Sequence, residues 1–417
     1  TTPCFLGFLL NHDNMEINLS DRISRIQTSQ TIEITDLARN LIAEGKKVIS
    51  LSQGEPDFDT PDHIKKAGIK AIKDGLTRYS NVDGMPLLKK AICNKFLNEN
   101  NLEYKVSEIS VGTGCKQIIF NALMSIINPG DEVIIPAPYW VSYKDMVDFA
   151  EGNPIIVNCT LADEFKLTAE ALELAISDST RCLILNNPTN PTGSVYSFDE
   201  LKSISEVLIK YPNILIISDD IYEYLIYSDS KFHTIAEIDT DIKKRTLTCN
   251  GMSKNFCMTG WRLGYAGGPK LLIDAMAKLQ SQSTFHPSTI SQYAALAAIN
   301  GSREFIAEQK ISYKERRDLT VSFLNKINGI TCNKPEGSFY VFPSCDGLYG
   351  SSTPSGEILH NDIDVCKFIL KTAEVTVVPG SVFGKSDFFR ICYAIDKKML
   401  IEALNRISNV LDKLNAN

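Results

Sequence analysis

The sequence predicts an α/β protein built on a mostly parallel β-sheet with helices on both faces. Two observations predict this class. Between residues 108 and 269, short apolar runs rich in β-branched residues alternate with helix-like stretches, which is typical of a parallel sheet buried on both sides. Each run also ends in an unusual polar loop. Ligands bind beyond the carboxyl ends of such strands, so we expect these loops to converge on one site.

Composition limits both the size and the kind of protein. The chain has 417 residues, of which 44% are hydrophobic and 22% charged, enough for a large core and two or three domains. A net charge of -7, without a basic run interleaved with aromatics, gives no support for nucleic-acid binding. The 11 cysteines form no Cys-x-x-Cys pair, and the five histidines have no metal-ligand spacing. We therefore predict free thiols in a reducing cytoplasm, and no metal site.

The first residues give no sign of a membrane or export segment. No apolar run reaches the roughly 18 residues that a membrane helix needs. Residues 1–14 include a short apolar patch but no basic region before it, which argues against a secretory signal. Met15 is a candidate natural first residue. We therefore interpret residues 1–14 as a leader or an added segment.

The elements before the sheet are helices separated by short polar stretches. Residues 21–45 include an apolar repeat of helical period that ends at Gly45, and a short strand follows at residues 47–51. Pro61 opens a helix that reaches about residue 74. A polar loop at residues 77–84 precedes a helix at residues 86–98.

Five strands are expected in the central region, and a second region follows it. The expected strands span residues 109–111, 133–135, 183–185, 214–217 and 246–248. After about Ile311 the pattern changes to that of a smaller α+β domain. It consists of a charged helix at 312–325, strand-like pieces at 339–342, 375–378 and 389–393, and a final amphipathic helix.

Lys254 is the candidate catalytic residue. It lies in the stretch Asn250 to Arg262, among small and uncharged neighbours. An amine in such a setting can lose its proton near neutral pH and attack a carbonyl, as a Schiff-base lysine does. A surface lysine is the alternative on this stretch alone, so the other motifs must decide.

The loop Gly112-Thr-Gly-Cys-Lys116 is a candidate anion site. It opens a helix, and the free N–H groups at a helix N-terminus bind anions. A dinucleotide fingerprint needs a third glycine where Gln117 stands, so the loop favours a phosphate over NAD. A plain strand-to-helix turn is an equally good interpretation of this loop alone.

Five further residues each have a structural and a chemical interpretation. Trp140 is either a core aromatic or a plate on which a flat ring stacks. Asn190 is a turn residue first of all. Asp219 is either a helix cap or a carboxylate that keeps a pyridine nitrogen protonated, with Tyr222 one turn further on. Arg390, in an apolar strand, pairs either with an internal carboxylate or with the carboxylate of a substrate.

Together these motifs resemble those of a pyridoxal-phosphate (PLP) aminotransferase of fold type I, in the class I branch. Within that branch, the pattern most resembles the bacterial aspartate and aspartate/prephenate enzymes. The resemblance extends from about Asp21 to the C-terminus, with seven motifs in the family's order. The motifs are Gly54-Glu55-Pro56-Asp57-Phe58, Tyr79, Tyr139-Trp140, Asn190-Pro191-Thr192-Gly193, Asp219-x-x-Tyr222, Ser253-Lys254 with Arg262, and Arg390.

The resemblance implies a domain plan and a homodimer. The large PLP-binding domain, with a seven-stranded sheet, spans residues 61–310. The small domain combines residues 15–60, which include an N-terminal arm, with residues 311–417, and it closes over the substrate. Tyr79 reaches the phosphate bound by the other subunit, so the active sites are shared.

The resemblance also implies the cofactor contacts. Lys254 forms the Schiff base and shuttles a proton, Asp219 pairs with the pyridine nitrogen, and Tyr222 contacts the ring hydroxyl. Cys115 stands where glycine or serine is more usual, which adds an oxidisable thiol, and Ser253 replaces a common alanine. The residues assigned to the cofactor are Gly114, Cys115, Lys116, Trp140, Asn190, Asp219, Tyr222, Ser253, Lys254, Arg262 and Tyr79.

For the substrate, the resemblance implies an amino acid with two carboxylates. Arg390 receives the α-carboxylate, and Lys116 resembles the lysine that meets a distal one, supported by hydroxyls near the N-terminus. The residues assigned to the substrate are Gly54, Lys116, Trp140, Asn190, Arg390, Ser29 and Thr31. The implied reaction is a two-step transamination between L-aspartate and 2-oxoglutarate.

Other functions stay open at this point. The same scaffold serves prephenate or aromatic amino-acid transamination, and a lyase uses the same cofactor. A non-catalytic effector-sensing module of a regulator is a third class, but the chain has no helix-turn-helix extension or basic patch.

Overall fold

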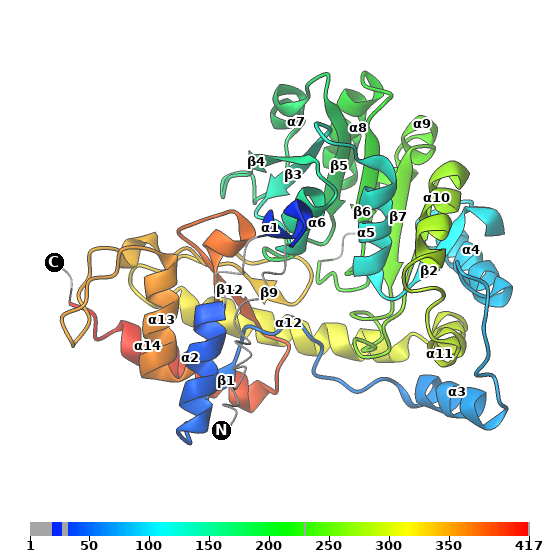
Figure 1. Cartoon of the computed structure of the whole chain (residues 1–417). Helices are drawn as coiled ribbons and strands as arrows, with labels where there is room; N and C mark the ends of the chain where they lie inside the picture. Colours follow the sequence, from blue (N-terminus) through cyan, green and yellow to red (C-terminus); the bar gives the residue numbers. More distant parts are fainter. Residues whose placement is uncertain (1–18, 27–31, 229–230, 416–417) are drawn as a thin grey trace, which may run out of the picture.

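The computed structural model describes residues 19–26, 32–228 and 231–415. A large sheet with its helices occupies one side of the molecule (Figure 1). The N-terminal α2 and β1 lie on the other side, next to α13 and α14 near the C-terminus. The long helix α12 (Glu304–Leu324) runs between the two sides. It crosses residue 311 without a break, so it begins earlier than the predicted 312.

The central sheet has seven strands in the order β2-β8-β7-β6-β5-β3-β4. All its pairings are parallel except those of β8, which is antiparallel to both β2 and β7. The five predicted strands are confirmed, and β4 and β8 were not predicted. The strands are β2 Ile109–Gly112, β3 Glu132–Ala137, β4 Asn153–Asn158, β5 Thr180–Asn186, β6 Leu215–Asp219, β7 Thr246–Gly251 and β8 Gly264–Gly267.

Side chains of successive strand residues enter separate cores on the two faces of this sheet. In β3, Val133 and Ile135 join a cluster with α5, α6 and α10, whereas Ile134 joins a cluster with α7 and α8. This period of two is the one expected for a strand, and burial on both faces explains the continuous apolar runs. The covering helices are α5 Cys115–Ile126, α6 Ser142–Phe149, α7 Ala169–Ala175, α8 Phe198–Ile209 and α10 Lys270–Ser281.

A third cluster covers the β2 edge of the sheet. Ile64 of α3 (Asp62–Lys73) and Ala294 and Ala295 of α11 (Thr289–Asn300) belong to it, together with residues of α4 (Pro86–Asn100). Both α3 and α4 were predicted, α4 two residues shorter. Thr240–Lys243 forms the short helix α9.

The remaining elements form two small sheets. In one, β1 (Ile49–Ser50) pairs in parallel with β10 (Val375–Thr376). In the other, β11 (Val378–Pro379) and β9 (Tyr340–Val341) flank β12 (Phe389–Cys392) in antiparallel register. The predicted strand at 375–378 is therefore split between two sheets. The helices α2 (Ile32–Ala43), α13 (Asp362–Ala373) and α14 (Lys397–Leu411) complete this part.

Segments from both ends of the chain share one core here. Leu51 is fully buried, its N–H donates to the Thr376 carbonyl (3.0 Å), and its carbonyl accepts from Cys392 N–H (2.8 Å). The segment before residue 60 is thus tied to the last hundred residues, far away in sequence. Among the described residues, no helix has the length and apolarity to cross a bilayer.

Leu51→Ala should lower thermal stability, because it leaves a cavity where the N-terminal segment meets β10 and β12. We expect a loss of about 2–5 kcal/mol, seen as a lower midpoint of thermal unfolding. Leu271→Ala is the matched control, since Leu271 is 84% exposed, and it should leave the midpoint nearly unchanged. Equal midpoints for the two variants would contradict this packing.

Candidate active site

A cavity of about 570 Å³ lies beyond the carboxyl ends of the parallel strands. The predicted convergence of loops is therefore observed. The predicted site residues that line the cavity are Gly54, Cys115, Lys116, Trp140, Asn190, Asp219, Tyr222, Ser253, Lys254, Arg262 and Arg390.

The topology of the sheet explains why these residues meet. Asp219 is the last residue of β6, and Lys254 follows the end of β7. Because β8 runs antiparallel, its first residue, Gly264, pairs with the last residues of β2 and β7, Gly112 and Gly251. Arg262, two residues before β8, therefore lies at the same edge of the sheet as Asp219 and Lys254.

The Lys254 amine is largely withdrawn from solvent. Its Nζ donates to the Gly54 carbonyl at 2.5 Å and lies 5.8 Å from the centroid of the Phe339 ring. Burial lowers the pKa of Lys254 to about 8, and the charges of Arg390 and Arg262 act in the same direction. A substantial fraction of the amine is neutral near physiological pH, as a nucleophile or proton acceptor requires.

The Asp219 carboxylate is buried at the floor of the cavity. Tyr143 donates its hydroxyl to Oδ2 (2.6 Å), and the Cys115 thiol and the Ile221 N–H face Oδ1 at 3.6 and 3.4 Å. Burial raises the pKa of Asp219, while these donors oppose the rise. A cationic nitrogen bound beside it would favour the charged carboxylate.

Arg390 places a buried cation in the wall of the cavity. It is 7% exposed, its Nη1 donates to Asn190 Oδ1 (2.9 Å) and its Nη2 to the Ser52 carbonyl (2.6 Å). Among the described residues, its Nε has no hydrogen-bond partner and no carboxylate lies within ion-pair distance of its guanidinium. Since a buried charge needs an anion, the arrangement fits a ligand carboxylate rather than an internal ion pair.

A cradle suited to a phosphate lies at the start of α5. The Arg262 guanidinium packs on Gly114, where an added Cβ would lie 2.6 Å from Nη2. A Cβ on Gly264 would lie 2.3 Å from the Cys115 backbone nitrogen. Glycine at position 114 thus lets the guanidinium, and glycine at position 264 lets β8, lie close to the start of the helix, where the first N–H groups lack partners within the helix.

Lys116 and Trp140 stand together on the wall of the cavity. Lys116 Nζ lies 4.8 Å from the Trp140 ring centroid, and burial together with the charge of Arg262 lowers the pKa of Lys116. Ser253 is buried. At Cys115 the neighbouring Cys249 thiol, together with burial, raises the pKa well above its usual range, so its thiol is protonated.

The other predicted residues lie elsewhere. Tyr79 is 90% exposed and packs edge-on against Phe285 and His286, outside the cavity. Ser29 and Thr31 lie outside the described residues, as do residues 1–14. Among the described residues, no cluster of three or more His, Cys, Asp or Glu side chains is placed to hold a metal ion.

Three residues that contribute to the site were not predicted from the sequence. Tyr340 donates to or accepts from the Tyr222 hydroxyl at 2.9 Å, and Tyr143 contacts Asp219. The Asn186 amide donates to the Asp219 carbonyl (2.8 Å) and accepts from Asn190 N–H (2.8 Å). Asn186 could have been predicted as a site residue, because it directly follows a predicted strand. Nothing in the sequence around Tyr143 or Tyr340 indicates that they belong to the site.

A family model described as aminotransferase class I and II matches residues 46–407. This chain belongs to that family. The aminotransferase is 50% identical over 398 residues to a probable aspartate/prephenate aminotransferase of Rickettsia conorii, covering 95% of this chain and 99% of the relative. It is also 50% identical to an aspartate aminotransferase of Rhizobium meliloti, covering 95% and 96% of the two chains.

Solved structures agree with this family assignment. The crystal structure of the Rhizobium meliloti aspartate aminotransferase matches with a TM-score of 0.94 at 49% identity, covering 96% of this chain and 100% of that one. The Thermus thermophilus aspartate aminotransferase with maleate matches with a TM-score of 0.87 at 37% identity, covering 94% and 100%. The predicted fold, a fold type I aminotransferase with a seven-stranded sheet, is confirmed.

The lowered pKa of Lys254 predicts early labelling by an amine-reactive reagent. In protein free of cofactor, the labelled fraction of Lys254 should rise with pH around a midpoint of about 8, because only the neutral amine reacts. An ordinary lysine titrates near 10.4. Peptide mass spectrometry measures the labelled fraction.

Glu55→Gln is the matched variant for this measurement. The Glu55 charge raises the pKa of Lys254, so its removal should move the midpoint to lower pH. A midpoint above pH 10 in the unaltered protein, or an upward shift in the variant, would contradict the assigned electrostatics.

Proposed function

We propose that this aminotransferase uses pyridoxal phosphate to transfer the amino group of L-aspartate to 2-oxoglutarate, giving oxaloacetate and L-glutamate. The observation that supports it is the juxtaposition, in one cavity, of the Lys254 amine, the buried Asp219 carboxylate and the Arg390 cation, which no carboxylate of the described residues neutralises. An amine with lowered pKa, a carboxylate and a carboxylate-binding arginine are the three groups that the reaction needs.

The cofactor contacts follow from the donors present. Bound pyridoxal phosphate supplies a ring that withdraws electrons from the amino acid's α-carbon. Asp219 would hold the proton of the ring nitrogen, and Trp140 would cover the ring. Arg262, with the first N–H groups of α5 and the space left by Gly114, would bind the phosphate.

The protein's own groups then act on the substrate. Arg390 binds the α-carboxylate by a two-pronged contact, with Asn190 fixing its guanidinium. Lys254 takes up the α-carbon proton on its neutral Nζ, which its lowered pKa permits, and would pass that proton on to the cofactor. Tyr222, whose hydroxyl is hydrogen-bonded to that of Tyr340 (2.9 Å), would contact the ring hydroxyl of the cofactor.

Two cations in the cavity support a substrate with two carboxylates. Lys116 and Arg390 both line it, and Lys116 would meet the distal carboxylate. The similar proteins support the same substrate class: all three are named for aspartate, and the Thermus thermophilus structure contains maleate, itself a dicarboxylate. Ser29 and Thr31 keep their proposed supporting role.

We further propose a homodimer with shared active sites. Tyr79 is 90% exposed, and Ile69, Ile72 and Leu76 nearby are 52%, 56% and 37% exposed, a surface suited to a second copy. The proposed domains remain residues 15–60 with 311–417, and 61–310. A cytoplasmic location is supported by the free thiols of all ten cysteines in the described residues.

Visible absorption of the cofactor-loaded protein tests the function. L-aspartate should bleach the yellow band, and 2-oxoglutarate should restore it. If only aromatic amino acids bleached it, the substrate class would be wrong. If no band formed with added pyridoxal phosphate, the cofactor would be wrong.

Prephenate is the second candidate acceptor. It is supported by the name of the Rickettsia conorii relative, "aspartate/prephenate", at 50% identity. A competition assay between oxaloacetate and prephenate as amino-group acceptors separates the two. Preferential use of prephenate would reassign the main activity.

Lys116→Ala should impair acidic substrates selectively. We expect KM for aspartate to rise by about ten- to a hundredfold, the effect of losing a hydrogen bond to a charged group. Turnover of an aromatic amino acid should be retained. Lys144→Ala, which removes a partly exposed lysine paired with Asp148, is the control. Unchanged aspartate kinetics in Lys116→Ala would exclude the distal-carboxylate role.

A further inference from the structure

The loop of residues 160–167 belongs to the large-sheet side of the molecule and packs against residues next to β9 and β12, the strand that contains Arg390. It connects β4 to α7, and its Phe165 ring is only 5% exposed. The ring packs edge-on against Phe342 (centroids 5.7 Å apart) and Phe388 (5.2 Å), which stack on each other at 5.1 Å. Phe342 follows β9, and Phe388 precedes β12.

These rings lead to the substrate-binding cation. Phe342 packs edge-on against Phe383 at 6.0 Å, and the Phe383 ring lies 4.9 Å from the Arg390 guanidinium carbon. Phe383 lines the active-site cavity. Phe165, Phe342, Phe383, Phe388 and Val378 form a core cluster of their own. Phe165 therefore reaches Arg390 through two intervening rings.

The loop adopts a conformation that its residues disfavour. Glu164 and Phe165 have φ of 53° and 59°, in the left-handed region, although neither is glycine. A turn closes behind them, with Phe165 N–H donating to the Thr160 carbonyl at 2.7 Å. Such a backbone persists only where the surroundings fix it, and it frequently marks a functional constraint.

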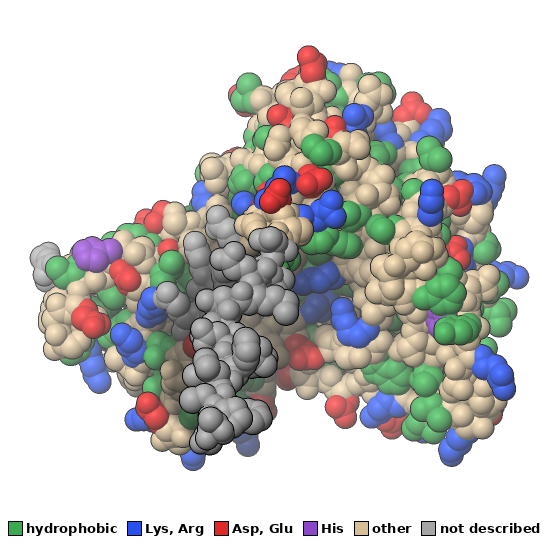
Figure 2. Space-filling model, in the orientation of Figure 1, with side chains coloured by type: hydrophobic (Ala, Val, Ile, Leu, Met, Phe, Trp, Pro, Cys, Tyr) green, Lys and Arg blue, Asp and Glu red, His purple; other side chains and the backbone are tan. Residues whose placement is uncertain are grey.

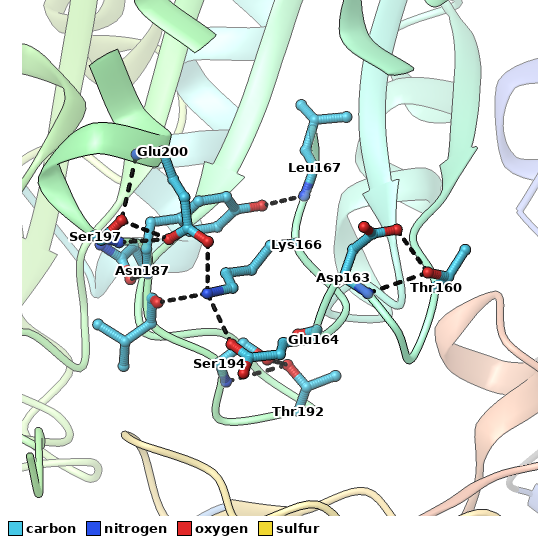
Figure 3. Close-up of polar contacts among 12 residues, drawn as sticks. Thr160, Asp163, Glu164, Lys166, Leu167, Asn187, Thr192, Ser194, Ser197 and Glu200 are labelled. Atoms are coloured by element: carbon cyan, nitrogen blue, oxygen red, sulfur yellow. Dashed lines mark hydrogen bonds and ion pairs between the residues drawn. The ribbon is translucent and has the colours of Figure 1, made fainter. Parts of the chain in front are cut away.

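A set of polar contacts holds this loop in place (Figure 3). Lys166 Nζ lies between the carboxylates of Glu164 (2.8 Å) and Glu200 (2.7 Å), with only 13% of its side chain exposed. Ser194 Oγ donates to the Glu164 carbonyl (2.5 Å), and Thr160 Oγ1 donates to Asp163 (2.6 Å). The loop is thereby fastened to the segment that follows Asn190.

Arg390 is contacted by one polar side chain and by two rings. Asn190 Oδ1 accepts from its Nη1 (2.9 Å), and its guanidinium carbon lies 4.5 Å from the centroid of the Tyr340 ring and 4.9 Å from that of the Phe383 ring. The Phe383 carbonyl also accepts from Tyr139 N–H (3.0 Å), next to Trp140. That bond fixes the backbone of Phe383, and its ring packs on Phe342, which in turn contacts Phe165 and Phe388.

From this geometry we infer that Phe165 is a positioning residue for the carboxylate site: its ring, held by the 160–167 loop, fixes Phe383 and so the orientation of Arg390. The inference rests on the proposed role of Arg390. According to this inference, the 160–167 loop contributes to substrate affinity as well as to packing. In Figure 2, acidic and basic side chains are interspersed over the part of this face that the described residues form.

Phe165→Ala tests the inference in the cofactor-loaded protein. KM for aspartate and for 2-oxoglutarate should rise roughly tenfold, as for a weakened charged hydrogen bond, with kcat nearly unchanged, since both substrates use the α-carboxylate contact. The dissociation constant of maleate should rise by the same factor. The cofactor spectrum should stay as in the unaltered protein. Phe165→Leu, which keeps an apolar side chain, should restore most of the affinity.

Phe96→Ala is the matched control for lost packing. Phe96 is fully buried and has two edge-on partners, Tyr104 and Tyr265, away from the cavity. It should lower thermal stability without changing KM. Equal KM effects in Phe96→Ala and Phe165→Ala, or an unchanged KM in Phe165→Ala, would overturn the inference. Absence of activity in the unaltered protein would instead refute the proposed function.

Lys166→Met provides a second route if Phe165→Ala does not fold. It releases the loop without opening the aromatic cluster, and KM should rise in the same direction. Lys210→Met is its control, because Lys210 pairs with Glu173 at the surface of the same region. Unchanged KM in Lys166→Met would show that the fastening of the loop has no part in substrate binding.

Discussion

The buried positive charge of Arg390 is the constraint on which the rest of the site depends. Desolvating a guanidinium is costly unless an anion compensates it. Here two neutral acceptors, Asn190 Oδ1 and the Ser52 carbonyl, satisfy only part of the guanidinium, and Nε has no partner in the part of the chain that the structure describes. The same charge helps to lower the pKa of Lys254. Binding affinity and amine reactivity are therefore linked through one side chain.

The fold places the Arg390 guanidinium at the edge of the sheet by packing together segments that are far apart in the sequence. Arg390 belongs to β12, but its partners come from the N-terminal segment and from the loop after β5. The antiparallel β8 similarly brings Arg262 to the edge formed by parallel strands. The cavity thus forms only when segments from the beginning, middle and end of the chain have packed together.

Some parts of the fold and of the candidate site could be predicted from the sequence, and others could not. Apolar runs followed by polar loops identified five strands, because burial on both faces leaves a strong pattern. The strand β8, Gly-Tyr-Ala-Gly, has a composition disfavoured in strands. It pairs with both β2 and β7, and Gly267 leaves room for the Tyr104 ring, because a Cβ there would lie 2.5 Å from the ring. The edge strand β4 contains a proline and is only half buried.

Among the site residues, those in sequence motifs could be identified, and those defined by contact could not. Lys254, Asp219 and Arg390 stand in recognisable local settings. Tyr143 and Tyr340 have ordinary settings in the sequence, and their hydroxyls reach Asp219 and Tyr222 only through the fold. The length of α12 was underestimated, because the apolar residues of Glu304–Leu324 are spread around the helix and give only a weak amphipathic pattern.

A crystal structure of the cofactor-loaded protein with maleate would test the central claim most directly. The account predicts one carboxylate of maleate in a two-pronged contact with Arg390, and the other directed to Lys116. A structure with maleate bound elsewhere, or with Arg390 paired to a carboxylate of the protein, would contradict it.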